Sequence, residues 1–339
     1  MSSSAHSDTK AMAPPRPELS TEAFVAGVMG GDRAILGRAI TLLESTHPSH
    51  RSQAQELLLA LMPHTGNAQR IGISGVPGVG KSTFIEAFGQ HLIECGHRIA
   101  VLTIDPSSTV TGGSVLGDKT RMSKLSQDAR AFIRPSPSGG TLGGVASRTR
   151  EVMLACEAAG FDVVLVESVG VGQSEATLAD LVDFFLLLML PSAGDELQGI
   201  KRGILEVVDM VAVNKADGAL LGAAQRARQD YDNALHILRG RDTPPVKLIS
   251  AATGHGIPEL WTSIAELFAK RTERQEIDAR RRAQALKWMW ALIDEQLLAH
   301  FRAHPEVVAT RGTVEHALNS RTLTPQIAAE RLLTAYRRD

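Results

Sequence analysis

The chain has 339 residues, of which 22% are charged, and its formal net charge at pH 7 is -1. This length is enough for one large α/β domain with about a hundred further residues. A nearly balanced charge argues against broad electrostatic binding to nucleic acid or to a membrane surface. Two cysteines, Cys95 and Cys156, cannot form a disulfide framework, which favours a reducing compartment. We therefore expect a soluble, cytoplasmic protein with no nucleic-acid partner and no membrane partner.

The N-terminal part of the chain divides into a polar tail and a helical extension. Residues 1–20 are rich in Ser, Ala and Pro and contain no apolar core of a signal peptide, so we expect a disordered tail. Between residues 21 and 66, apolar residues recur at helical spacing, with interruptions at a Gly-Gly pair and a His-Pro pair. This pattern predicts about three short helices that pack on the next domain.

From residue 67 to residue 260 the pattern changes to apolar runs that alternate with amphipathic helices. The runs lie at 71–74, 99–104, 131–133, 163–166, 182–190, 210–213 and 246–249. Helical patterns lie at 82–94, 145–158, 200–207 and 219–238. Strands separated by helices predict an α/β fold with a mostly parallel sheet that is covered on both faces. Ligands of such sheets bind beyond the carboxyl ends of the strands, so we expect functional residues directly after the runs.

The last part of the chain, residues 261–339, is predicted to be helical. The stretch 259–303 has the pattern of one long helix or of two, and a His-Pro pair ends it. Two shorter helices are expected near 313–318 and 325–336. A stripe of apolar residues runs along the long stretch: Leu286, Met289, Trp290, Ile293, Leu297 and Phe301. We interpret this stripe, with Trp288 beside it, as buried dimer or domain packing rather than as a cofactor site.

A glycine-rich loop stands between the first apolar run and the helical pattern that follows it. The loop reads Gly75, Val76, Pro77, Gly78, Val79, Gly80, Lys81 and Ser82, and Thr83 comes next. The order of strand, GxxxxGK[ST] loop and helix is the context in which this motif binds the phosphates of a nucleotide. Glycine lets backbone N–H groups converge on phosphate, and the N-terminus of the helix adds positive potential. We expect Lys81 to reach the β- and γ-phosphates and the Ser82 hydroxyl to bind Mg²⁺.

A second motif predicts which base the nucleotide carries. The tetrapeptide that follows the run at 210–213 is Asn214, Lys215, Ala216 and Asp217. The Asp217 carboxylate can accept two hydrogen bonds from the ring N–H and the exocyclic amine of guanine, a pairing that adenine cannot make. An unpaired buried carboxylate is costly, so this residue can discriminate strongly between the bases. The residues after the last run are Ser250, Ala251 and Ala252. Their backbone N–H groups are placed to bind the base oxygen, and the sequence predicts GTP or GDP rather than ATP.

Carboxylates follow two other strands of the predicted sheet. Asp105 comes directly after the run at 99–104, and Glu167 comes directly after the run at 163–166. Both are expected to face the crevice in which Mg²⁺ bridges the phosphates, because this ion prefers a few carboxylates together with water. Asp118, in the loop between the two, would approach the metal only when that loop closes. The alternative is that each carboxylate caps a helix or forms an ion pair in its loop.

The stretch after Glu167 bears on the rate of hydrolysis. In Ras-type GTPases a glutamine after the glycine of the DxxG motif orients the attacking water. Here Val171 follows that glycine and can orient nothing, so we expect slow intrinsic hydrolysis unless Gln173 or a partner supplies the missing group. In the loop 194–203, Lys201 could stabilise developing charge in the manner of an arginine finger. The alternative is that this loop is only a solvated entry to a helix.

With these motifs together, the chain resembles the methylmalonyl-CoA mutase-associated GTPases, the MeaB/ArgK family of P-loop GTPases. The likeness rests on the glycine-rich loop and on 105–108, 167–175, 195–203 and 214–217, and it covers residues 20–339. The resemblance implies a P-loop NTPase fold and a homodimer formed through the C-terminal helices. It also implies a GTP-dependent chaperone of an adenosylcobalamin-dependent acyl-CoA mutase. Such a protein gates cofactor loading and rescues the inactivated mutase, while the mutase accelerates GTP hydrolysis.

The resemblance also implies roles for individual positions. Lys81 and Ser82 would hold phosphate and Mg²⁺, and Asp105, Asp118 and Glu167 would belong to the metal and switch network. The loop at 195–201 resembles the additional switch loop of the family, which responds to the partner.

Two other functions are compatible with parts of the pattern. A GTPase that inserts nickel needs a metal-binding cluster, and the candidate here is His91, Cys95 and His97, without a CxxC motif or a His-rich tract. A nucleotide-hydrolysing accessory of basic amino-acid transport would use ATP and associate with a membrane, at odds with Asp217 and with the charge balance. The sequence contains no DxHxxG-type cobalamin site, so we expect that the chain does not itself hold B12 tightly.

Overall fold

The computed structural model describes residues 19–104, 122–136, 142–168, 174–191 and 202–337. Within these residues the strands form one seven-stranded sheet in the order β3-β2-β4-β1-β5-β6-β7, and each neighbouring pair is parallel. The strands are β1 (Gln69–Gly75), β2 (Ile99–Ile104), β3 (Ala131–Ser136), β4 (Val163–Ser168), β5 (Phe184–Met189), β6 (Met210–Val213) and β7 (Val246–Leu248). The predicted α/β fold with a parallel sheet is confirmed, and the strands differ from the predicted runs only at their ends.

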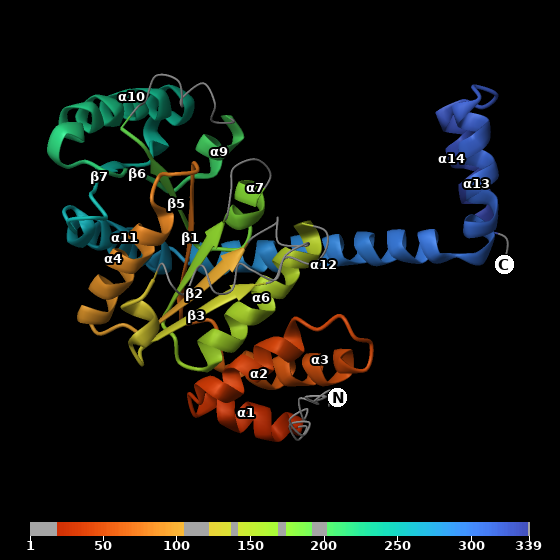
Figure 1. Ribbon diagram of the computed structural model, residues 1–339, viewed down its shortest axis with the longest axis horizontal. Coiled ribbons are helices and arrows are strands. Elements are labelled where there is room, and N and C mark those ends of the chain that lie inside the picture. Colours follow the sequence, from red (N-terminus) through yellow and green to blue (C-terminus); the bar gives the residue numbers. More distant parts are fainter. Residues whose placement is uncertain (1–18, 105–121, 137–141, 169–173, 192–201, 338–339) are drawn as a thin grey trace, which may run out of the picture.

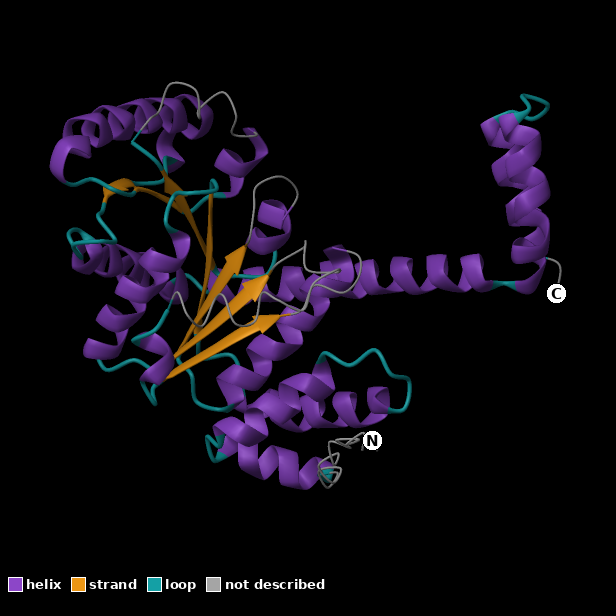
Figure 2. Ribbon diagram, in the orientation of Figure 1, coloured by secondary structure: helices purple, strands orange, loops and turns teal. Residues whose placement is uncertain are grey.

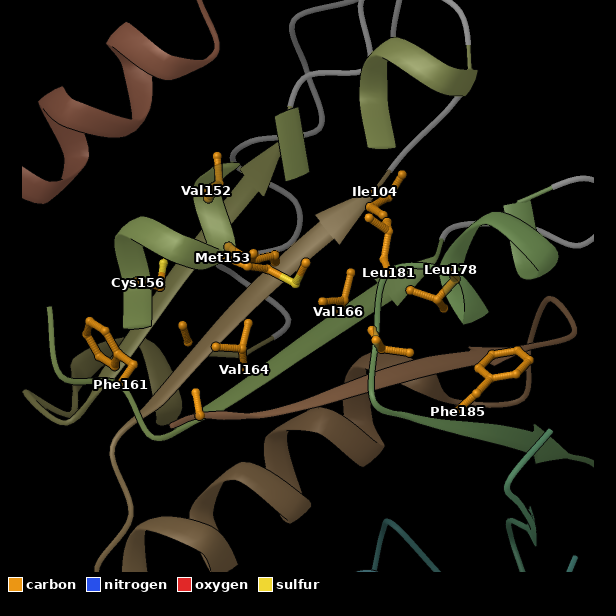
Figure 3. Packing of buried hydrophobic residues seen from close by; sticks show 14 of the residues in the cluster. Ile104, Val152, Met153, Cys156, Phe161, Val164, Val166, Leu178, Leu181 and Phe185 are labelled. Carbon is orange, nitrogen blue, oxygen red and sulfur yellow. The ribbon is translucent and has the colours of Figure 1, made fainter. Parts of the chain in front are cut away.

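Helices cover both faces of the sheet (Figure 1). One face is covered by α4 (Lys81–Glu94) and α11 (Ile257–Glu273). The core of the other face includes residues of α6 (Leu142–Ala158), α7 (Ser174–Ala179), α9 (Arg202–Val207) and α10 (Leu221–Arg239). Figure 3 shows this second core, in which Met153 of α6 lies near Val164 and Val166 of β4. Short 3-10 turns complete the framework: η1 (Met62–His64), η2 (Leu125–Gln127), η3 (Gly218–Leu220) and η4 (Gly240–Asp242).

Three short helices form the N-terminal extension, as the two interruptions in the sequence predicted. They are α1 (Thr21–Met29), α2 (Arg33–Leu43) and α3 (His50–Leu61), and they pack near α6 (Figure 2). Asp32 caps α2, since its Oδ1 accepts a hydrogen bond from the N–H of Ala34 over 2.8 Å. Arg134 of β3 pairs with Glu44 at the end of α2 over 2.5 Å, which fixes the extension to the edge strand of the sheet. Most of the predicted tail, residues 1–18, lies outside the described residues.

The C-terminal region leaves the body of the molecule as a long helical arm. After α11 it consists of α12 (Glu276–Ala303), α13 (Pro305–Asn319) and α14 (Pro325–Tyr336). The stretch that the sequence predicted as one helix or two is two helices, separated at Gln275, whose φ is 58°. Figure 1 shows α12 extending away from the sheet, with α13 and α14 at its far end. α13 begins at Pro305, well before residue 313, because proline fits the first turn of a helix. No helix in the described ranges has the length and apolar character to cross a bilayer.

Candidate functional site

The glycine-rich loop joins the end of β1 to the start of α4. β1 ends at Gly75 and α4 begins at Lys81, so the loop lies at the N-terminus of a helix. Gly80, directly before α4, has a φ of 93°, and a Cβ added there would lie 3.1 Å from Asn214 Nδ2. A Cβ on Gly75 would lie 2.5 Å from the carbonyl oxygen of Leu188 on β5. These two positions need glycine, because the loop passes so close to its neighbours.

The side chain of Lys81 lies across this loop. Its Nζ donates a hydrogen bond to the carbonyl oxygen of Gly75 over 2.7 Å. Val79 is buried in the core beneath the loop, whereas Pro77 and Gly78 are exposed. An anionic phosphate oxygen is a stronger partner for an ammonium group than a neutral carbonyl oxygen is. The loop therefore presents an exposed side and a cation to an anionic ligand.

Asn214 connects the loop to two other segments at the same edge of the sheet. Its side chain is buried; Nδ2 donates to the carbonyl oxygen of Val79 over 2.8 Å, and Oδ1 accepts from the N–H of Ala251 over 3.0 Å. The next residue, Lys215, has a φ of 59° and donates from Nζ to the carbonyl oxygen of Gly78 over 2.8 Å. The asparagine and the lysine together fix the glycine-rich loop to the segments that follow β6 and β7.

Asp217 and the turn after β7 lie at this edge as well. The N–H of Ala216 donates to the carbonyl oxygen of Ile249 over 3.0 Å, which holds the segment after β6 next to the turn after β7. Asp217 precedes η3 and is half-buried, and its side chain makes no capping hydrogen bond to that turn. Ser250 is fully buried, whereas Ala252 is exposed. The half-buried Asp217 and the turn after β7 therefore lie at the same edge of the sheet, where the sequence predicted the base.

Glu167 lies at the carboxyl end of β4, on the face of the sheet that α4 covers. It is 4% exposed, and its position is in register with Ile73 of β1 and Thr103 of β2. Side chains alternate along a strand, so the next residue faces the opposite side. There the Ser168 hydroxyl donates to Ser74 Oγ over 2.9 Å. The carboxylate of Glu167 therefore faces the helix that follows the glycine-rich loop.

The described residues of the predicted site come from the carboxyl ends of four strands and share one edge of the sheet. They are Gly75, Val76, Pro77, Gly78, Val79, Gly80, Lys81, Ser82 and Thr83 after β1, Glu167 in β4, Asn214, Lys215 and Asp217 after β6, and Ser250, Ala251 and Ala252 after β7. Other predicted residues lie outside the described part of the chain: Asp105, Asp118, Val171, Gln173 and Lys201.

Sequence reasoning missed several polar contacts at this edge. The motif predicted that Asn214 belongs to the site, but not that it bridges the backbone of Val79 and Ala251. It also missed the hydroxyl pair between Ser74 and Ser168. The sequence carries no local signal for that pair, because Ser74 is followed by Gly75 within β1 and Ser168 follows the charged Glu167 in β4. Recognising it required the register between β1 and β4, which only the structure gives.

The cluster proposed as a nickel site is partly engaged in other contacts. His91 Nε2 lies 3.6 Å from Cys95 Sγ, whereas His97 Nδ1 contacts Asp162 over 2.8 Å. The other cysteine, Cys156, is buried, and this burial raises the pKa of its thiol. In the ranges that the structure describes, no group of three or more His, Cys, Asp or Glu side chains is arranged to hold a metal ion.

The fold and this edge together define a class of protein. A parallel sheet leads from its central strand through a glycine-rich loop into a helix, and an Asn-Lys-x-Asp segment is bound to that loop. These features define a P-loop protein that binds guanine nucleotides. The chain belongs to the family of methylmalonyl-CoA mutase-associated GTPases, because the family model, MeaB, matches residues 36–306.

Named relatives are similar over most of the chain. GTPase ArgK of Escherichia coli is 46% identical over 305 residues, which cover 89% of this chain and 92% of that protein. A mouse protein named methylmalonic aciduria type A homolog, mitochondrial, is 47% identical over 324 residues, with coverage of 92% and 78%. The crystal structure of the LAO/AO transport system kinase has a TM-score of 0.75 at 38% identity and covers 93% of this chain and 96% of its own. This chain is therefore a GTPase with GTP and GDP as ligands.

Proposed function

We propose that this GTPase binds GTP together with Mg²⁺ and acts as a switch for an adenosylcobalamin-dependent acyl-CoA mutase. In this proposal, GTP hydrolysis gates the loading of the cofactor and protects or reactivates the mutase. We divide the chain into a helical extension at 21–66, a GTP-binding domain at 67–260 and a dimerisation region at 261–339. The observation that carries the proposal is the pair of hydrogen bonds in which Asn214 donates to Val79 and accepts from Ala251, because it joins the predicted phosphate loop to the predicted base loop.

The nucleotide is proposed to lie along the carboxyl edge of the sheet. The phosphates lie against the backbone of 75–83, and Lys81 exchanges the carbonyl oxygen of Gly75 for a phosphate oxygen, which is the stronger acceptor. Asp217 pairs with guanine, and the backbone N–H groups of 250–252 bind the base oxygen. Asn214 keeps the two halves of this site at a fixed separation, which lowers the entropic cost of binding.

Magnesium fits the oxygen donors next to α4. The carboxylate of Glu167 is almost fully buried and faces the helix that begins with Lys81 and Ser82. A buried carboxylate beside a hydroxyl is a set of hard oxygen donors of the kind that this ion prefers. We propose that Ser82 and Glu167 hold the ion, together with Asp105 and Asp118 from the segment that follows β2. When bound, it neutralises charge on the phosphates.

Hydrolysis is proposed to proceed by in-line attack of water on the γ-phosphate. Lys81 binds the phosphate and stabilises the negative charge that develops in the transition state. Glu167 keeps its carboxylate at the metal side of the phosphates, and Lys201 adds positive charge. Because Val171 cannot orient the water, Gln173 or a group of the mutase does so. This deficit supports an enzyme that its partner accelerates.

The names of relatives support the partner. The family is named for its association with methylmalonyl-CoA mutase, and the mouse relative is named for methylmalonic aciduria. The solved relative, a transport system kinase, supports a second candidate, an accessory of basic amino-acid transport. That candidate predicts binding of ATP, and a nickel-inserting GTPase predicts binding of nickel at a metal cluster. Each can therefore be distinguished from the mutase chaperone by measuring which ligand binds.

A homodimer formed through α12 is part of the proposal. In the described chain most of the apolar stripe on α12 is exposed: Leu286, Met289, Trp290, Ile293 and Leu297. Exposed apolar surface of this extent on one helix marks an interface, and a second copy of the same helix would cover it. Light scattering should give a dimer for the wild type and a monomer for Trp290→Glu. The control Ile237→Glu changes an 85% exposed residue of α10 and should leave the dimer intact.

Calorimetry with GTP, GDP and ATP tests the nucleotide. Asp217→Ala should weaken GDP binding by about 100-fold, because guanine loses both hydrogen bonds to the carboxylate. Asp230→Ala is the matched control, since Asp230 is an exposed aspartate on α10, and its GDP affinity should equal that of the wild type. A wild-type preference for ATP over GTP would reject the proposal and favour the transport candidate.

Titration of purified acyl-CoA mutases into a GTPase assay tests the partner. We expect at least one adenosylcobalamin-dependent mutase to form a complex with this chain and to raise its rate of GTP hydrolysis. Cobalamin-independent acyl-CoA enzymes serve as controls and should leave the rate unchanged. If no mutase alters the rate or binds the chain, the chaperone role is wrong, although the GTPase assignment stands.

A further inference from the structure

Thr103 of β2 carries a buried hydroxyl group with which no described residue forms a hydrogen bond. The residue is 1% exposed, and its Oγ1 has no hydrogen-bond partner among the residues that the structure describes. The rest of the strand is apolar and consists of Ile99, Ala100, Val101, Leu102 and Ile104. A buried hydroxyl that forms no hydrogen bond destabilises the fold, and valine has nearly the same shape without this cost. Among the contacts of the described residues, the threonine therefore has no structural advantage over valine.

The register of the sheet places Thr103 beside the proposed metal site. Thr103 of β2 pairs with Glu167 of β4, and Glu167 pairs with Ile73 of β1. Ile99 and Val101 belong to the core on the α4 side of the sheet, so alternation puts Thr103 on that side too, as it does Glu167. Neighbouring strands lie about 4.8 Å apart, so a hydroxyl and a carboxylate at paired positions can interact directly or through one water.

The opposite face of the same edge provides a contrast. There the hydroxyl groups of Ser74 and Ser168 are also buried, and they form a hydrogen bond with each other over 2.9 Å. The polar groups on that face are thus satisfied within the chain. On the face that leads to the start of α4, by contrast, none of the described residues forms a hydrogen bond with the Thr103 hydroxyl.

We infer that Thr103 is a positioning residue for the hydrated divalent cation that accompanies the nucleotide. Its hydroxyl donates to the oxygen shell that Glu167 presents to the cation and so fixes the orientation of that carboxylate. The missing hydrogen bond forms only when cation and nucleotide are bound. The inference rests on the proposed function, because it uses the cation that this function places between Ser82 and Glu167.

Two substitutions separate this role from a purely structural one. Thr103→Val removes the hydroxyl and keeps the shape, whereas Thr103→Ser keeps the hydroxyl. The Mg²⁺ affinity of the GDP complex is measured from the Mg²⁺ dependence of the release of a fluorescent GDP analogue, and Mn²⁺ binding from its electron paramagnetic resonance signal. We expect Thr103→Val to weaken cation binding about 10-fold and Thr103→Ser to change it by less than about twofold.

Thermal unfolding without ligand is the second readout, and its expected sign is opposite. Thr103→Val should raise the melting temperature by about 2 °C, because the variant no longer buries an unpaired hydroxyl. Thr149→Val is the matched control, since Thr149 of α6 is equally buried but does have an interaction partner. That control should lose thermal stability and keep its cation affinity.

The outcomes distinguish this inference from the proposal on which it rests. Unchanged Mg²⁺ and Mn²⁺ affinity in Thr103→Val would overturn the inference and leave the proposed function intact. A variant that loses cation affinity and thermal stability together would also overturn it, because the effect would then be structural. Wild-type protein that binds GDP with no dependence on a divalent cation would instead remove the metal part of the proposed function.

Discussion

The two edges of the sheet hold their polar groups in different ways. At the carboxyl edge, the cations Lys81 and Lys215 donate to neutral carbonyl oxygens of the glycine-rich loop. At the amino edge, the buried carboxylates of Glu157, Asp183 and Asp209 are paired with arginines. The exposed ammonium group of Lys215 can still gain from an incoming anion, whereas a charge in a buried pair is already compensated. The carboxyl edge can therefore bind an anionic ligand, whereas the charges at the amino edge are already paired within the chain.

Asp183 is an example of a buried charge at the amino edge that is paired within the chain. Its side chain is fully buried and accepts hydrogen bonds from the backbone N–H of Arg70 over 3.1 Å and from Arg281 Nε over 2.8 Å. Arg281 also donates to the carbonyl oxygen of Ala68, which precedes β1. Since Arg281 belongs to α12, these bonds fasten the helical arm to the start of the central strand.

Further contacts attach α12 to the turn between α7 and β5. Arg280 donates to the carbonyl oxygen of Ala179 over 3.0 Å, and Gln284 donates to the carbonyl oxygen of Val182 over 2.9 Å. Residue 284 lies about one turn after residues 280 and 281, so the three side chains point to the same side of the helix. The arm that carries the exposed apolar stripe is thus held at the amino edge, opposite the predicted nucleotide site.

The largest effect that we expect comes from removing a buried carboxylate at the amino edge. Asp183→Ala should lower the free energy of unfolding by about 3–5 kcal/mol, because it leaves the partly buried Arg281 without its buried counter-charge and the N–H of Arg70 without an acceptor. Urea denaturation measures this loss. Asp180→Ala is the control, since Asp180 pairs with Lys287 at the surface, and its cost should be about 0–1 kcal/mol. Equal losses in the two variants would show that the buried pairs do not stabilise the amino edge.

A smaller effect is expected at the carboxyl edge, and on ligand binding more than on the fold. Asn214→Ala removes the link between the carbonyl oxygen of Val79 and the N–H of Ala251. GDP binding should weaken by about 2–3 kcal/mol, because the phosphate loop and the base loop are no longer held together. Calorimetry measures the change, and Lys215→Met, which removes one exposed contact to Gly78, should cost about 1 kcal/mol. An Asn214 variant with wild-type affinity would contradict the bridging role.

The carboxyl edge was largely predictable from the sequence, and the amino edge was not. The glycine-rich loop and the Asn-Lys-x-Asp segment are local patterns, and each follows an apolar run that is recognisable as a strand. The pairs at the amino edge join residues far apart in the chain, such as Arg281 with Asp183 and Arg271 with Asp209. No local pattern marks those residues, because their pairing depends on where α11 and α12 pack against the sheet.

The same distinction explains the remaining differences in the fold. The break between α11 and α12 falls at Gln275, in a stretch whose apolar periodicity continues on both sides, so the sequence left one helix and two helices equally open. The unpaired hydroxyl of Thr103 was also missed, because its position opposite Glu167 depends on the register of two strands. Periodicity identifies an element, whereas pairing between elements requires the three-dimensional structure.

The smallest expected effect tests whether an exposed pair at the amino edge contributes as the buried ones do. Asp128 precedes β3, and hydrogen bonds from the side chain and backbone of Arg130 lower the pKa of Asp128 to about 2. A lowered pKa means that this carboxylate stabilises the fold above its unfolded pKa of about 3.9 and loses that contribution as the pH falls through about 2. The melting temperature of Asp128→Asn should therefore lie below that of the wild type at about pH 6, and the two should converge toward about pH 2.

The difference in melting temperature should be slight, since the guanidinium of Arg130 is half exposed and water screens the pair. A gap as large as that for Asp183→Ala, or one that does not change with pH, would mean that burial is not what separates the strong contacts of this edge from the weak ones.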